Sequence, residues 1–109
     1  MDITITPHGR TVVVAPQDSV DSHNAQDLQE QLLPLFEDAD AVILDGHAMP
    51  FITSAGLRVL LMAQQKGTTP KQFILCAINA EVRDVFRVAG LDALFHYEDN
   101  TQSALKAVS

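Results

Sequence analysis

Three short apolar runs, each followed by a segment of helical periodicity, restrict the fold of this chain more than any other feature. They lie at residues 41–45, 72–77 and 94–97. Strands that are apolar on both faces are typical of parallel sheets, in which helical crossovers of one hand join neighbouring strands. The pattern therefore predicts an α/β fold with these three runs as parallel strands of one sheet.

The beginning of the chain predicts an antiparallel hairpin. Residues 2–6 alternate apolar and polar side chains, and residues 11–15 are mostly β-branched. The residues between them, Pro-His-Gly-Arg at 7–10, are typical of a turn. Together with the three apolar runs, the hairpin predicts a mixed sheet of about five strands.

About four helices are expected to pack against this sheet. Asp21 and Ser22 offer N-cap side chains for a first helix that runs to about Phe36. Pro34 should kink or end the last turn of this helix. The inward stripe of the helix is expected to comprise Ala25, Leu28, Leu32 and either Leu35 or Phe36.

Capping and stop residues delimit the other three helices. The second helix is expected from about Ser54 to Lys66, and the fourth from residue 101 to residue 108. Asn79 can cap the third helix, which Gly90 closes. The inward stripe of the third helix is expected to comprise Val82, Val85, Phe86 and Ala89. We expect residues 1–109 to form one domain.

Composition narrows the classes of partner. The net charge is −7 and the seven basic residues are scattered, whereas nucleic acids and anionic membrane surfaces attract clustered Lys and Arg. No apolar run approaches the ~20 residues of a membrane span, and the N-terminus lacks a signal-peptide pattern. We therefore expect a cytoplasmic protein with another protein as its partner, no nucleic acid and no membrane insertion.

No catalytic or metal-binding pattern is evident. The four histidines and Cys76 show no metal-ligand spacing, and Cys76 itself lies in an apolar run typical of an inert core thiol. Asp45 ends a central run, but the acidic cluster that would accompany a phosphoaccepting aspartate is missing. Ser54 lacks the first glycine of a G-x-S-x-G nucleophile elbow. We therefore expect no metal, no cofactor and no enzymatic activity.

The function depends on the role of Ser54, which stands where a loop turns into the second helix. A hydroxyl at the positive end of the helix dipole is either a helix cap, contributing about 1 kcal/mol, or a phosphate acceptor. The two roles are compatible. Arg58 and Met62 follow Ser54 at intervals of four, so these residues share one stripe that suits a protein-binding patch. Packing of Met62 under a neighbouring loop is the alternative.

The segment 41–61 resembles the signature of STAS domains, especially the anti-sigma factor antagonist branch. That signature is an apolar strand ending in Asp, a loop with an apolar-aromatic pair, and Asp-Ser-Ser-Gly-Leu at the start of a helix. The matching residues are Asp45, Phe51, Ile52, Ser54, Gly56 and Leu57. The order of elements and the length also fit, so the resemblance covers essentially the whole chain and implies a single STAS-like domain.

The resemblance implies a phosphorylation switch. In this family the serine that corresponds to Ser54 is phosphorylated by a serine kinase of the histidine-kinase-like ATPase fold, which doubles as an anti-sigma factor. The unphosphorylated protein binds the kinase and frees the sigma factor, and a PP2C-type phosphatase resets the switch. Thr53 replaces the aspartate of the signature and is a second, less favoured acceptor, while Ala55 replaces its second serine.

The expected partner-binding residues are Asp21, Thr53, Ser54, Gly56, Arg58 and Met62. Asp21 falls where the family usually has an aspartate in the loop after the second strand. Asp45 is expected to order the loop that follows it. The alternative function is that of a constitutive STAS subunit docked on a lipid-transporting ABC complex, which needs no phosphorylation.

Overall fold

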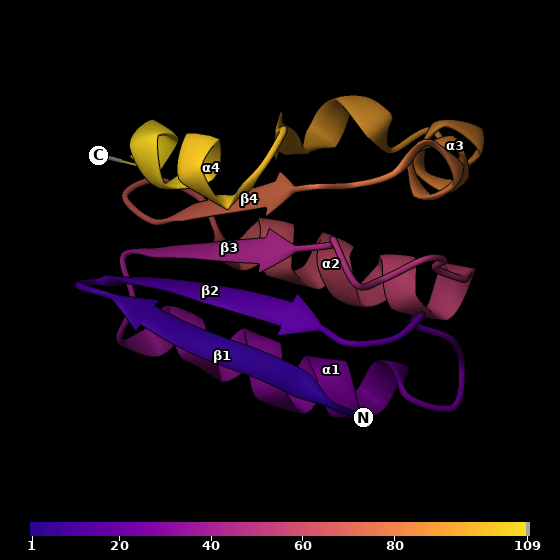
Figure 1. Ribbon diagram of the computed structural model, residues 1–109, viewed down its shortest axis with the longest axis horizontal. Helices are drawn as coiled ribbons and strands as arrows, with labels where there is room; N and C mark the ends of the chain where they lie inside the picture. The colour runs from indigo at the N-terminus through magenta and orange to yellow at the C-terminus, as the bar shows by residue number, and fades with distance from the viewer. Residues whose placement is uncertain (109) are drawn as a thin grey trace.

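The hairpin and the three apolar runs form one five-stranded sheet in the order β1-β2-β3-β4-β5 (Figure 1). The computed structural model describes residues 1–108. The strands are β1 (Ile3–His8), β2 (Thr11–Pro16), β3 (Ala41–Asp45), β4 (Gln72–Cys76) and β5 (His96–Glu98). β1 pairs antiparallel with β2, and every other neighbouring pair is parallel. The predicted mixed sheet of five strands is therefore confirmed.

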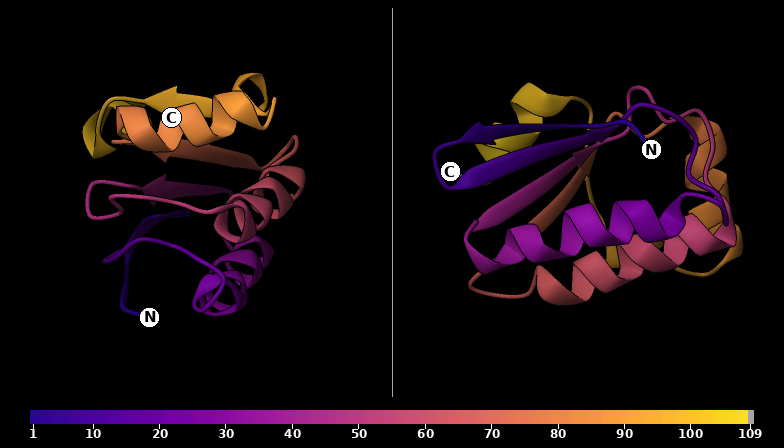
Figure 2. Two further views of the ribbon diagram at one scale, coloured as in Figure 1. Left: turned by 90° about the vertical axis from the view of Figure 1, so that its right-hand side faces the viewer. Right: turned by 90° about the horizontal axis from the view of Figure 1, so that it is seen from below.

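Four α-helices and two short 3₁₀ helices complete the fold. The α-helices are α1 (Ala25–Leu32), α2 (Ser54–Lys66), α3 (Ala80–Val88) and α4 (Thr101–Val108), and the 3₁₀ helices are η1 (Leu33–Glu37) and η2 (Asp92–Leu94). α1 and α2 lie side by side on one face of the sheet, and α4 lies on the opposite face (Figure 2). α3 and the start of α2 lie at the same end of the molecule, to the right in Figure 1.

Each face of the sheet has its own apolar core. Val42 and Leu44 of β3 belong to the larger core, which also contains Phe86 of α3. Ile43 points to the other face and joins a smaller core with Ala104 of α4. This alternation explains the apolar run 41–45, because side chains of both orientations are buried.

Three local predictions differ from the structure. The first helix begins at Ala25 and not at Asp21, because residues 22–24 form a separate turn that also holds His23. The helix ends at Leu32 and not near Phe36, because a 3₁₀ segment begins at Leu33 with Pro34 in its first turn, which agrees with the expected effect of Pro34. The fifth strand begins two residues later than expected, at His96.

The inward stripes are confirmed except at two positions of α3, Val85, which is only half-buried, and Ala89. Ala25, Leu28, Leu32 and Phe36 are buried, as are Val82 and Phe86 of α3. Ala89 is exposed instead, because α3 ends at Val88 and the chain turns away at the C-cap. The predicted bounds of α2 and α4 agree with the structure.

An isolated parallel bridge joins the loop after β2 to the loop after β3. The Val20 N–H donates to the Phe51 carbonyl at 3.1 Å, and the Thr53 N–H donates to the Val20 carbonyl at 2.9 Å. Val20 and Ile52 are both completely buried. The bridge therefore fixes the segment that leads into α2 against the segment that leads into α1. None of the helices within residues 1–108 combines the length and apolarity needed to cross a bilayer.

Candidate functional site

Ser54 is the first residue of α2, and its side chain is exposed. The N-cap position belongs to Thr53, whose backbone is extended (φ −96°, ψ 176°) and whose side chain makes no capping hydrogen bond. Ser54 is therefore not the cap of its helix, which corrects one of the two roles considered for it. Its hydroxyl is left accessible beside the first turn of α2.

The neighbouring hydroxyl of Thr53 has a different environment. Thr53 Oγ1 is buried and has no hydrogen-bond partner among the described residues. The Thr53 backbone is held by the bridge to Val20, which directs the side chain inward. The Thr53 hydroxyl is therefore shielded from the surface, whereas the Ser54 side chain is exposed.

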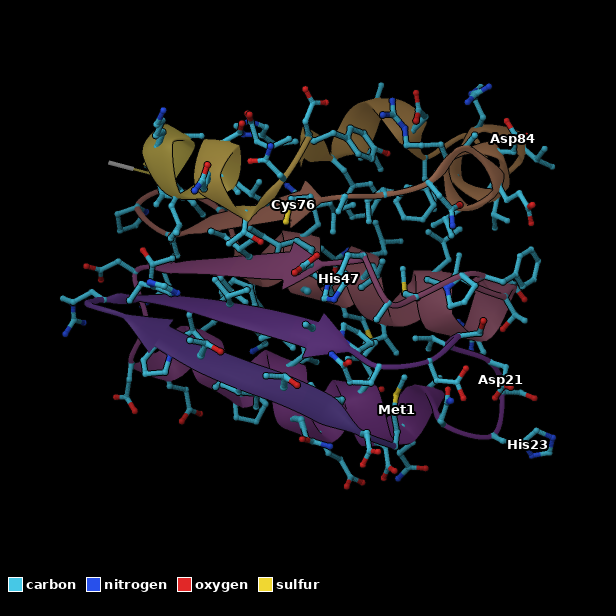
Figure 3. The ribbon with its side chains drawn as sticks, in the orientation of Figure 1. Met1, Asp21, His23, His47, Cys76 and Asp84 are labelled. Carbon is cyan, nitrogen blue, oxygen red and sulfur yellow. The ribbon has the colours of Figure 1, made fainter. Side chains whose placement is uncertain are left out.

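The bridge also brings the loop that carries Asp21 next to the start of α2. The Asp21 carboxylate accepts hydrogen bonds from the N–H groups of His23 at 2.8 Å and Asn24 at 3.3 Å. In return, the Asn24 side chain accepts from the Asp21 N–H at 2.9 Å. Asp21 thus orders its own loop and leaves its side chain half-buried. Figure 3 shows Asp21 at the same end of the molecule as Asp84 of α3.

A groove of about 520 Å³ lies between the start of α2 and α3. It is lined by Phe51, Ser54, Leu57, Glu81, Asp84, Val85, Val88 and Ala89. Its apolar lining includes two of the most exposed large apolar residues, Phe51 at 43% and Val88 at 90% exposure. Clustered exposed apolar side chains with a polar rim are typical of protein-docking surfaces. We refer to this set of residues as the Ser54 groove.

The charges lining the groove are negative. Glu81 and Asp84 are both exposed, and Asp84 forms a surface ion pair with Arg87 at 3.0 Å. Arg58, one turn along α2 from Ser54, is exposed and has no ion pair or hydrogen bond within residues 1–108. A phosphate on Ser54 would therefore stand between two carboxylates across the groove and a guanidinium on its own helix.

Gly56 and Met62 differ in their accessibility. Gly56 is buried under the bridge, where an added Cβ would lie 2.7 Å from Ile52 Cγ1 and 2.8 Å from Val20 Cγ1. Gly56 therefore allows α2 to approach the bridge and offers no surface to a partner, which differs from the expectation. Met62 is half-buried on the stripe of Ser54 and Arg58.

Asp45 lies outside the groove and orders the loop after β3. Its carboxylate accepts a hydrogen bond from the His47 N–H at 3.0 Å, and His47 Nδ1 lies 2.9 Å from Asp45 Oδ2. The Thr101 hydroxyl donates to the same oxygen at 3.4 Å and is 3.8 Å from Cys76 Sγ. Burial raises the pKa of the Cys76 thiol to about 11, which keeps it protonated and unreactive. Figure 3 shows His47 and Cys76 near the ends of the β3 and β4 arrows.

Within residues 1–108, no three His, Cys, Asp or Glu side chains are grouped closely enough to hold a metal ion. His47, in the loop after β3, lies next to the Asp45 carboxylate. No third acid, histidine or cysteine among the described residues joins this pair to form a ligand set. What the site offers is an exposed hydroxyl on an apolar groove.

The family model of the STAS domain matches residues 2–104. The chain belongs to the STAS domain family. This STAS domain is 30% identical over 109 residues to BtrV of Bordetella bronchiseptica, assigned by name to the anti-sigma factor antagonists, with 98% of this chain and 94% of BtrV covered.

Solved structures agree with this membership. An anti-sigma factor antagonist from Mycobacterium paratuberculosis has a TM-score of 0.89 and 25% identity, with 98% of this chain and 92% of that chain covered. The unphosphorylated anti-sigma factor antagonist SpoIIAA, from Bacillus, has a TM-score of 0.80 and 19% identity, with 98% and 96% covered. The fold of this STAS domain is therefore that of its family, and BtrV and the two proteins of known structure described here are anti-sigma factor antagonists by name.

The α3 side of the groove was not among the predicted site residues. The signal that could have indicated it is Val88, an apolar residue outside the inward stripe of α3. Phe51, quoted only as part of the family signature, gives the same signal in the loop before α2. Neither residue indicates by itself that the two segments are adjacent, because that depends on how α3 packs beside α2.

Proposed function

We propose that this STAS domain is a cytoplasmic, phosphorylation-controlled antagonist of an anti-sigma factor that is also a serine kinase. The observation that carries the proposal is the exposed Ser54 hydroxyl on an apolar groove. In the proposed cycle the unphosphorylated groove binds the kinase, which has a histidine-kinase-like ATPase fold, and relieves its inhibition of a target.

Phosphorylation would end this binding through two physical effects. A phosphoserine carries about −1.5 to −2 charges near neutral pH and holds a hydration shell that an apolar contact would have to remove. The phosphate would also be repelled by Glu81 and Asp84, which line the same groove. Both effects act on the surface, so the fold remains intact while the affinity for the partner falls.

We assign the acceptor role to Ser54 and not to Thr53. The Ser54 side chain is exposed, whereas Thr53 Oγ1 is buried beside the bridge between the two loops. In the transfer, Ser54 Oγ forms a new bond to the γ-phosphorus of ATP, ADP leaves, and a base of the kinase takes the hydroxyl proton. A PP2C-type phosphatase hydrolyses the phosphoserine. Catalysis therefore belongs to the partners.

The surrounding residues have supporting roles in this proposal. Arg58 and Met62 extend the docking surface along α2, and Asp21 orders the loop that is bridged to the start of α2. Asp45 orders the loop after β3 through His47. Gly56 acts from beneath the surface by permitting the close approach of Val20 and Ile52.

The switch is tested with the cognate kinase, ATP and three variants. Mass spectrometry should place the phosphate on Ser54, and Ser54→Ala should remain unmodified while still binding the kinase. Ser54→Asp should bind at least about tenfold more weakly, equivalent to ~1.4 kcal/mol. Thr68→Asp adds the same charge in the exposed loop after α2 and should bind like wild type. Wild-type affinity in Ser54→Asp together with an unmodified Ser54 would contradict the proposal.

The groove is tested separately from the phosphate. Val88→Glu places a charge among the apolar lining residues and should weaken kinase binding at least about tenfold, because the contact must then desolvate a carboxylate. Leu94→Glu is the matched control, since Leu94 is exposed at 51% and does not line the groove. Equal effects of the two substitutions would argue against the groove as the docking site.

A further inference from the structure

Arg58 differs from the other three arginines of the chain. Arg10 pairs with Asp40, Arg83 with Asp92, and Arg87 with Asp84, at distances of 2.9 to 3.0 Å. Arg58 is exposed and lacks any such partner in the part of the chain that the structure describes. Its guanidinium group, with five N–H donors, is therefore available to a new anion.

The position of Arg58 makes Ser54 its natural neighbour. Residues four apart on a helix lie on the same face with their Cβ atoms about 5–6 Å apart. Ser54 and Arg58 occupy such positions on α2, and both side chains are exposed. α2 contains no Asp or Glu that could compete for the guanidinium.

We propose that Arg58 binds the phosphate on Ser54 within the same molecule. This inference rests on the proposed phosphorylation of Ser54. Two charge-assisted N–H···O hydrogen bonds from the planar guanidinium can reach two oxygens of one phosphate, an arrangement that arginine favours over lysine. The pair forms only after modification, because the neutral hydroxyl offers no charge to hold a long, mobile side chain.

The charges around Ser54 also favour a phosphate that points toward Arg58. Glu81 and Asp84 line the groove with Ser54 and repel a dianion. Arg87 is already engaged by Asp84 at 3.0 Å, so the α3 side of the groove presents more negative than positive charge. The phosphate should therefore turn from α3 toward Arg58 on its own helix.

Phosphorylation then changes the docking surface in a second way. Before modification the Arg58 guanidinium is free to bind a carboxylate of the partner, and afterwards it is occupied by the phosphate. The phosphorylated protein thus loses a cation from its surface in addition to gaining an anion in the groove. The switch then depends on a phosphate that the Arg58 guanidinium can bind through two hydrogen bonds. An aspartate at position 54 supplies a negative charge but reproduces this contact only in part.

The test uses protein in which phosphoserine is incorporated at position 54 during synthesis. The second ionisation of the phosphate is followed by ³¹P NMR as a function of pH. A guanidinium next to the phosphate stabilises the dianion and lowers its second pKa. In Arg58→Gln that pKa should rise by roughly 0.2 to 0.7 units, the size expected for an exposed ion pair.

Two further variants separate the pair from the overall charge. Arg10→Gln removes the same charge at the hairpin turn, remote from the groove, and should leave the phosphate pKa unchanged. Arg58→Lys should give an intermediate value, because lysine keeps the charge without the bidentate geometry. The circular dichroism spectra of Arg58→Gln and Arg58→Lys should match that of wild type, since Arg58 has no partner to lose within residues 1–108.

The same phosphate pKa in wild type and Arg58→Gln would overturn the inference, as would an equal rise in Arg10→Gln. Neither result depends on a kinase, because the phosphate is introduced during synthesis. If a kinase leaves Ser54 unmodified while Arg58 still lowers the phosphate pKa, the proposed function fails and the pairing stands. If the kinase modifies Ser54 and the phosphate pKa does not depend on Arg58, the proposed function stands and the pairing fails.

Discussion

At position 56 a glycine stands where helix propensity alone would favour alanine. Removing a glycine from a helix interior normally stabilises the helix by about 1 kcal/mol. Here the packing opposes that gain, because an added Cβ would meet Ile52 and Val20 at 2.7 and 2.8 Å. Both neighbours are completely buried, so they have little room to move.

We predict that Gly56→Ala lowers the free energy of unfolding by about 1–3 kcal/mol, the usual cost of overpacking, in spite of the better helix propensity. Denaturant unfolding followed by circular dichroism measures this change. Gln65→Ala, at an exposed position of the same helix, should differ from wild type by less than about 0.5 kcal/mol. A stabilised Gly56→Ala protein would show that the bridge can shift away from α2.

At the scale of elements, Asn79 joins the start of α3 to the loop before α2. Its Oδ1 accepts a hydrogen bond from the Val82 N–H at 2.8 Å and so caps α3. Its Nδ2 donates to the Pro50 carbonyl at 3.0 Å. One side chain therefore links the two segments that form the Ser54 groove.

Substitutions of Asn79 can separate the cap from the link. Asn79→Ala loses both hydrogen bonds and should destabilise the protein by about 1 kcal/mol. Asn79→Asp keeps the acceptor that caps α3 but loses the donor to Pro50, so its stability should stay near wild type. We predict that its amide chemical shifts nevertheless change around Phe51, and that kinase binding weakens. Unchanged shifts in Asn79→Asp would mean that Pro50 is held in place by other contacts.

A second cluster joins α3 to η2 and β5. The Arg83 guanidinium donates to Asp92 Oδ1 at 3.0 Å and stacks 3.6 Å from the ring centroid of Tyr97, whose hydroxyl donates to the same Asp92 oxygen at 3.2 Å. The hydrogen bond from Arg83 lowers the pKa of Asp92 below its usual value. Burial, together with the Asp92 carboxylate, raises the pKa of Tyr97 to about 12.

Because its pKa is lowered in the folded protein, ionised Asp92 stabilises the folded state, and this contribution depends on pH. A carboxylate with a lower pKa in the folded state stabilises that state above its unfolded pKa of about 3.9, and the contribution is lost as the pH falls through the folded pKa. We predict that the difference in unfolding free energy between wild type and Asp92→Asn is constant near neutral pH and shrinks below about pH 4. Denaturant titrations at several pH values measure it. A difference that grows with acidity would contradict the assignment.

At the scale of the whole molecule, the parts predicted well from sequence are those with local signals. The apolar run 41–45 is buried on both faces, so its parallel pairing followed from composition alone. The start of α1 was misplaced because Asp21 and Asn24 can both begin a turn, and only the packing of the loop selects Asn24 as the N-cap. The α3 side of the groove depends on tertiary placement, for which the chain carries no local signal.

Binding of the kinase should protect one end of the molecule only. We predict that hydrogen exchange slows at residues 51–57 and 81–89, which contain the groove, when the unphosphorylated protein binds its partner. Thr4 and Thr6, exposed on β1, should exchange at the same rate free and bound. Protection of β1 with none at α3 would place the interface on another face of the sheet.

The groove is shared between two helices that are separate in sequence, and this has a consequence for how such proteins diverge. Ser54, the proposed acceptor, belongs to α2, while Glu81, Asp84, Val85 and Val88 of the lining belong to α3. If the proposed switch holds, substitutions of the apolar α3 residues Val85 and Val88 could, after gene duplication, redirect a copy to a new kinase while the charged groups that act on the phosphate stay in place. Paralogues in one cell can in this way share a single chemical signal and still avoid cross-talk.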